Sequence, residues 1–170
     1  MDLRAIQAPL KERYRSEPDA AIITLTAHAN ETSGPMACSV DLGRAIYAAE
    51  AHAGVGGAGT AACSGDLLLA ALAACAQLTC QMVANASGLP VDSVNVTVEG
   101  DLDLRGTLGV SRHAPVGFQA IRVNYDVRGS DLTERQMGDL KKRAEAFCVV
   151  MQTLVAPPAI ETVWESHPAG

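Results

Sequence analysis

Residues 23–28 alternate between apolar and polar side chains, and so do residues 94–99. A period of two is typical of a strand with one buried and one solvated face, so both stretches predict β-strands. Further strands are expected over residues 36–42, 45–51, 118–127 and 160–164.

Residues 65–87 predict a long buried helix, because apolar side chains occupy all of its faces. The segment contains an unbroken apolar run from Leu67 to Ala76. Ser64 or Asp66 can cap its first turn by accepting hydrogen bonds from backbone N–H groups. A Gly-Leu-Pro sequence at 88–90 is expected to end it.

A second helix is predicted to start at Asp131, which precedes Glu134 by three residues as in a capping pair. The prolines at 157–158 are expected to stop it. Its apolar face carries Met137, Leu140, Ala144, Cys148 and Met151.

The order of these elements indicates the α+β class, since hairpins and segregated helices do not fit a doubly wound sheet. We expect one domain over residues 1–170, in which residues 1–20 form an N-terminal extension with one or two helical turns. Residues 100–117 are expected to form a long, partly irregular connection.

Composition narrows the choice of partner. The formal net charge of −6 argues against binding to nucleic acid or to an anionic membrane surface. The longest apolar run is about half of the roughly 20 residues that a membrane span needs. No basic segment followed by an apolar one marks a secretory signal, so we expect a cytoplasmic protein.

No metal or organic cofactor is expected. The five cysteines include no CxxC pair and the four histidines are scattered, which gives little support for a zinc site. A glycine-rich stretch at 52–64 lacks a phosphate-binding lysine and is interpreted as a flexible connector.

Two cysteines are candidates for chemistry. Cys75 lies inside the apolar run, and Cys148 lies on the apolar face of the second predicted helix. A single buried cysteine is usually a small core residue. Two thiols on separate core helices, however, could meet and form a redox pair. Cys75 lies too far from its helix start for the dipole to lower its pKa much, so a nearby arginine would be needed.

The other cysteines are assigned mainly to packing. Cys80 lies about 140° around the helix from Cys75, so these two cannot pair while the helix holds. Cys80 and Cys38 are expected to be core residues, and the role of Cys63 stays open.

The segment at 64–75 resembles the central-helix motif of the OsmC/Ohr family, the osmotically induced and organic-hydroperoxide-resistance proteins. The resemblance continues at 88–94, 99–106 and 144–150, and it covers about residues 20–165. It implies an intertwined homodimer, with curved antiparallel sheets around two long central helices and two sites at the subunit interface.

The resemblance also implies a reaction. Cys75 matches the peroxidatic cysteine, which attacks an organic hydroperoxide and releases an alcohol. Cys148 matches the cysteine that condenses with the resulting sulfenic acid to a disulfide. A dithiol reductant, a dihydrolipoyl protein in some members, reopens that disulfide without any metal or organic cofactor.

Two alternatives remain open. Gly65 stands where characterised peroxidases carry a glutamate, and the hairpin at 30–35 lacks their activating arginine, for which Arg44 is the closest candidate. The chain could therefore be a non-catalytic protein that binds an apolar small molecule at the dimer interface. A cysteine hydrolase would instead need His52 or His113 beside Cys75.

Overall fold

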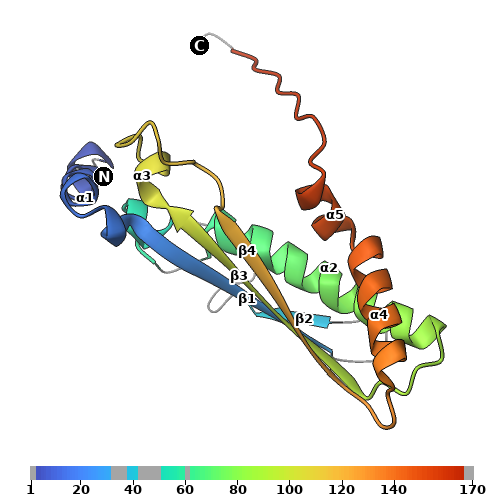
Figure 1. Cartoon of the computed structure of the whole chain (residues 1–170). Helices are drawn as coiled ribbons and strands as arrows, with labels where there is room; N and C mark the ends of the chain where they lie inside the picture. The colour runs from blue at the N-terminus through green and yellow to red at the C-terminus, as the bar shows by residue number, and fades with distance from the viewer. Residues whose placement is uncertain (1–2, 32–37, 42–50, 60–61, 167–170) are drawn as a thin grey trace.

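The computed structural model describes residues 3–31, 38–41, 51–59 and 62–166, of which 3–7, 24–31 and 38–41 are described by their backbone. One antiparallel sheet carries the fold, with strands in the order β2-β1-β3-β4 (Figure 1). The strands are β1 (Ile22–Glu31), β2 (Cys38–Asp41), β3 (Ser93–Asp103) and β4 (Ala120–Arg128).

These strands confirm the predictions for 23–28, 94–99 and 118–127, and β2 lies within the predicted 36–42. Residues 45–50 of another predicted strand lie outside the described residues. The expectation of an irregular connection from residue 100 is wrong at its start. The strand β3 continues through Asp103 because β1 pairs with it over the whole length, from Asn30 opposite Asn95 to Ile22 opposite Asp103.

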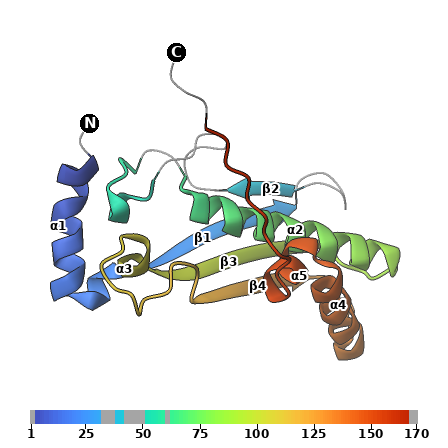
Figure 2. The ribbon, with the colours of Figure 1, turned by 90° about the horizontal axis from the view of Figure 1, so that it is seen from above.

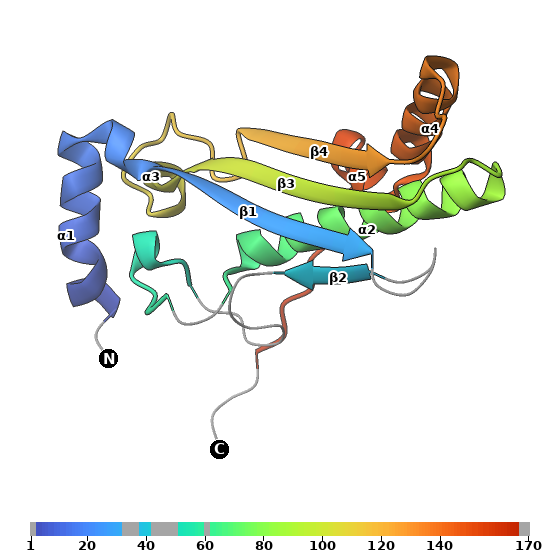
Figure 3. The same cartoon turned by 90° about the horizontal axis from the view of Figure 1, so that it is seen from below.

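The helix α2 (Ser64–Ala86) lies across one face of the sheet (Figures 1 and 3). Every second residue of β3 faces it, and Val94, Val96 and Val98 are at most 1% exposed. The pattern of alternate burial along β3 therefore forms the floor of the core, on which the buried leucines and alanines of α2 pack. The α+β class is thereby confirmed.

The start of α2 resolves the role of Cys63. Cys63 is the N-cap residue, and its backbone N–H donates to the carboxylate of Asp66 at 2.8 Å. Neither Ser64 nor Asp66 is the N-cap itself, although Asp66 supplies the reciprocal half of the capping box. The helix ends as predicted, before Gly88 at a φ of 62°.

The second predicted helix is two helices, α4 (Glu134–Phe147) and α5 (Val149–Val155), and the expectation of a continuous helix is wrong. Cys148 breaks it with an extended backbone, at φ −72° and ψ 102°. Two consecutive β-branched valines follow, which weakens the tendency to continue a helix. Figure 2 shows α5 turning away from α4 and lying over α2.

The start of α4 also differs from the sequence expectation. Thr133 is the N-cap and forms a capping box with Gln136. Asp131 instead adopts a left-handed φ of 58° in the preceding turn, so it cannot cap with Glu134. The strand expected over 160–164 is absent from the described chain, because that segment lies beside no sheet edge, and Trp164 is 91% exposed.

The N-terminal segment is more regular than expected. It forms α1 (Leu3–Ser16) and a short 3₁₀ turn η1 (Pro18–Ala21), at the opposite end of the sheet from α4 (Figure 3). Tyr14 donates a hydrogen bond to the carbonyl of Gly54, at the turn η2 (Ala53–Val55), and packs in a small cluster with Leu104 of α3 (Leu104–Thr107).

By length and composition, α2 is the one helix of the described residues that could span a membrane. Within the fold, however, 61% of its most apolar stretch is buried, as is common in the core helix of a globular protein.

Candidate thiol site

Cys75 and Cys148 are brought together by the break between α4 and α5. Cys75 lies in the middle of α2 and is half-buried, whereas Cys148 is 0% exposed. Because the backbone at Cys148 is extended, α5 starts a new direction there and its first turn faces Cys75. Both thiols pack in the same core cluster, and they lie close enough that each shifts the pKa of the other.

The surroundings of Cys75 favour its thiolate. Burial raises the pKa of Cys75, but the backbone N–H of Val150, the thiol of Cys148, the hydroxyl of Thr79 and the backbone N–H of Val149 lower it. The net result is a pKa below the ordinary value. The Thr79 hydroxyl lies one helical turn along α2, at 3.9 Å from the Cys75 sulfur. Hydrogen-bond donors around a sulfur stabilise its charged form.

Cys148 has the opposite preference. Burial raises its pKa, and so does the neighbouring Cys75, while the N–H groups of Met151 and Val150 oppose this shift. When one proton is lost from the pair, the charge therefore resides on Cys75 and the proton on Cys148. The site therefore combines a partly exposed, more readily ionised sulfur on Cys75 with a buried, protonated sulfur on Cys148.

Backbone N–H groups in the first turn of α5 lower the pKa of Cys75, a role for which the sequence led us to expect an arginine. Among the described residues, the groups that lower the pKa of Cys75 are backbone N–H groups, a hydroxyl and a thiol, with no cation among them. The N–H groups of a helix's first turn have no partner within the helix and carry partial positive charge. Arg44 lies outside the described residues, so its role stays a prediction.

The other sequence candidates lie elsewhere. The Nδ1 atom of His52 accepts a hydrogen bond from the N–H of Gly54 in η2, and His113 is exposed in the loop after α3. Neither imidazole is among the groups that act on Cys75, which removes the basis for a hydrolase. Within the part of the chain that the structure describes, no cluster of three metal-ligating side chains occurs.

An apolar groove of about 370 Å³ lies beside the thiol pair, between α2, β4 and α5. Leu72, one turn before Cys75, and Met151, one turn after Cys148, line the groove together with Phe118, Ile121 and Leu154. Leu72 belongs to the apolar run that contains Cys75, whereas the contribution of α5 depends on the break at Cys148, which the sequence did not predict.

Comparison with known proteins is consistent with this geometry. A search of functionally curated proteins finds no match. The family model described as OsmC-like protein matches residues 57–163, which is more than half of the chain and includes both thiols of the site. The chain therefore belongs to the OsmC-like protein family.

Proposed function

We propose that the protein is a thiol peroxidase that reduces organic hydroperoxides to alcohols through Cys75 and Cys148. The observation that carries this proposal is the proximity of the two thiols in one core cluster, where their pKa values shift in opposite directions. Membership of the OsmC-like family supports it, since that family includes peroxidase-like members.

In the first step, the Cys75 thiolate attacks the terminal oxygen of the hydroperoxide. The O–O bond breaks as the S–O bond forms, so the sulfur is oxidised to a sulfenic acid and the leaving alkoxide takes a proton to become the alcohol. Cys75 is the better nucleophile of the pair because it is half-buried and more readily ionised, whereas Cys148 has no exposed surface.

In the second step, the Cys148 sulfur attacks the sulfur of the sulfenic acid. An S–S bond forms, and hydroxide leaves with the proton of Cys148 as water. A dithiol reductant, of which a dihydrolipoyl protein is one example, then returns two electrons and two protons and is itself oxidised to a disulfide. We place this cycle in the cytoplasm, where thiols are kept reduced.

The groove beside the thiols supports an organic rather than an inorganic peroxide. Most of its lining is apolar, and Leu72 and Met151 in that lining lie about one helical turn from Cys75 and Cys148 in the chain, so a hydrocarbon group in the groove would lie near the thiols. Burial of that group would favour binding by roughly 25 cal/mol for each Å² removed from water.

A homodimer belongs to the same proposal. Leu67, Leu68 and Met82 of α2 are each 38% exposed, and Phe147 and Val149 near the site are more exposed still. Apolar side chains gathered along a core helix and beside a reactive site are typical of a surface that a partner covers. A second copy of the chain is the proposed partner, and it would close the groove next to Cys75.

Binding without catalysis is a second candidate. It is favoured by the apolar groove and by the lack of a cation among the described groups that act on Cys75. The non-catalytic protein would hold an apolar molecule in the groove while its thiols stayed reduced.

Turnover of cumene hydroperoxide with a small dithiol separates the two candidates. Cys75→Ser should abolish turnover, whereas Cys148→Ser, tested without the dithiol, should consume about one equivalent and then stop at the sulfenic acid. Cys80→Ser, the same change on the same helix, should retain turnover. Wild-type protein that binds the compound but never consumes it would overturn the peroxidase proposal in favour of binding alone.

A further inference from the structure

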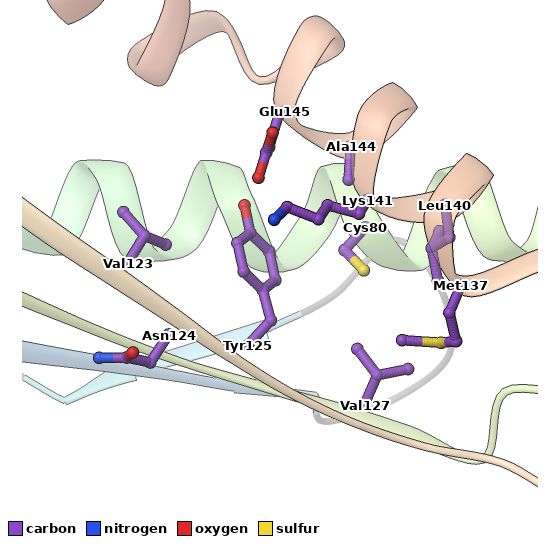
Figure 4. Close-up of a pocket in the computed structure, with 10 residues that line it drawn as sticks. All are labelled: Cys80, Val123, Asn124, Tyr125, Val127, Met137, Leu140, Lys141, Ala144 and Glu145. Carbon is purple, nitrogen blue, oxygen red and sulfur yellow. The ribbon is translucent and has the colours of Figure 1, made fainter. Parts of the chain in front are cut away.

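A second pocket lies between β4, α4 and α2 (Figure 4). Its volume is about 300 Å³, and neither Cys75 nor Cys148 lines it. Most of its wall is apolar and is formed by Val127, Met137, Leu140 and Cys80. This volume is at the small end of the range for ligand pockets, and it fits one or two fused rings.

The polar end of the pocket contains a hydroxyl group without a partner. The Tyr125 hydroxyl is shielded from solvent, yet it forms no hydrogen bond with any residue that the structure describes. Burial raises the pKa of Tyr125, so the hydroxyl keeps its proton and remains a donor. Buried polar groups are nearly always hydrogen-bonded, and an exception calls for an unseen partner.

Two opposite charges lie near this hydroxyl. Lys141 and Glu145, one helical turn apart on α4, extend toward Tyr125 from above, as Figure 4 shows. Among the described residues these two form no ion pair with each other, although their spacing permits one. The same space is therefore bordered by an ammonium, a carboxylate and a neutral donor.

We propose that this pocket binds a small apolar molecule that carries one neutral hydroxyl group, such as a phenol or a naphthol. A hydroxyl can accept from Tyr125 or Lys141 and donate to Glu145 at the same time. A carboxylate ligand would be repelled by Glu145, and an amine by Lys141. A pure hydrocarbon would leave the Tyr125 hydroxyl without a partner, at a cost in free energy.

Isothermal calorimetry with 2-naphthol tests the proposal, with naphthalene-2-carboxylate as the charged comparison. We expect 2-naphthol to bind at least about tenfold more tightly, which corresponds to the loss of one good polar contact. Tyr125→Phe removes only the hydroxyl and should weaken 2-naphthol binding at least about fivefold. Tyr14→Phe, the same change in the other apolar cluster, should leave the Kd unchanged.

Two further variants locate the ligand. Met137→Trp places a bulky ring at the half-buried edge of the pocket and should abolish binding, whereas Val116→Trp, at an exposed residue of the loop before β4, should bind 2-naphthol as the wild type does. Circular dichroism of each variant checks that it is folded. Equal affinity for the two ligands, an unchanged Kd in Tyr125→Phe, or no heat at the solubility limit would overturn the proposal and leave a pocket that holds only water.

Discussion

The thiol of Cys75, in the middle of α2, lies close enough to the thiol of Cys148, at the break between α4 and α5, for each to shift the pKa of the other. In a continuous helix, the residues after Cys148 would keep the direction of α4. The break gives Cys148 an extended backbone and directs the first N–H groups of α5 at the Cys75 sulfur. One irregular residue thus supplies both the second sulfur and the donors that stabilise the first as thiolate.

The first prediction concerns the pH dependence of Cys75. Its thiolate fraction grows as pH rises through its pKa, and that pKa lies below the ordinary 9.0 in the folded protein. The rate of alkylation by iodoacetamide should therefore reach half its maximum below pH 9.0 in the folded protein and at a higher pH in urea. Peptide mass spectrometry identifies the labelled cysteine. Equal midpoints in the two conditions would contradict the assigned shift.

The second prediction tests the source of that shift. Val150→Pro removes the N–H that contributes most among the backbone donors, so we expect it to raise the pKa of Cys75. Val149→Pro is the matched control with a smaller effect, since its N–H contributes less and proline is well tolerated at the first helical position. The same alkylation profile measures both variants.

Arg44→Ala provides the competing comparison. If the backbone of α5 activates Cys75, this variant should shift the pKa of Cys75 less than Val150→Pro does. A larger shift in Arg44→Ala would assign the activation to the arginine that the sequence resemblance pointed to.

The third prediction concerns the proposed dimer. Leu68→Glu places a charge on the exposed apolar side of α2 and should weaken self-association about tenfold or more, because a desolvated charge opposes an apolar interface. Val116→Glu, the same kind of change on an exposed residue of the loop before β4, should leave the association unchanged. Sedimentation velocity over a concentration series reports both. A wild type that stays monomeric at every concentration would refute the dimer.

The fourth prediction concerns the cap of α4. Thr133→Ala should lower the free energy of unfolding by about 1 kcal/mol, because it removes the side chain that accepts from the N–H of Gln136. Asp131→Gly should not lower it, since glycine adopts the left-handed φ of this position without strain. Urea unfolding measures both changes. An unaffected Thr133→Ala would contradict the observed cap.

The sequence pattern predicted the paired strands, because burial of one face imposes a period of two, and it predicted the buried helix α2, because apolar side chains occupy all of its faces. It could not predict the break at Cys148, where the apolar face continues through Met151 and only tertiary contact with α2 fixes the new direction. Two overlapping capping patterns start at Asp131 and Thr133, and the geometry of the turn after β4 selects the second. A strand at 160–164 would need to pair with a sheet edge, and this segment pairs with none of the described strands.

The most direct test of the redox pair is peptide mapping after the reduced protein receives one equivalent of cumene hydroperoxide, with free thiols blocked by alkylation under denaturing conditions. The account predicts a disulfide-linked peptide pair containing Cys75 and Cys148, with Cys63 and Cys80 alkylated. Cys75 oxidised beyond sulfenic acid while Cys148 remains a free thiol, or both cysteines still alkylated, would contradict it.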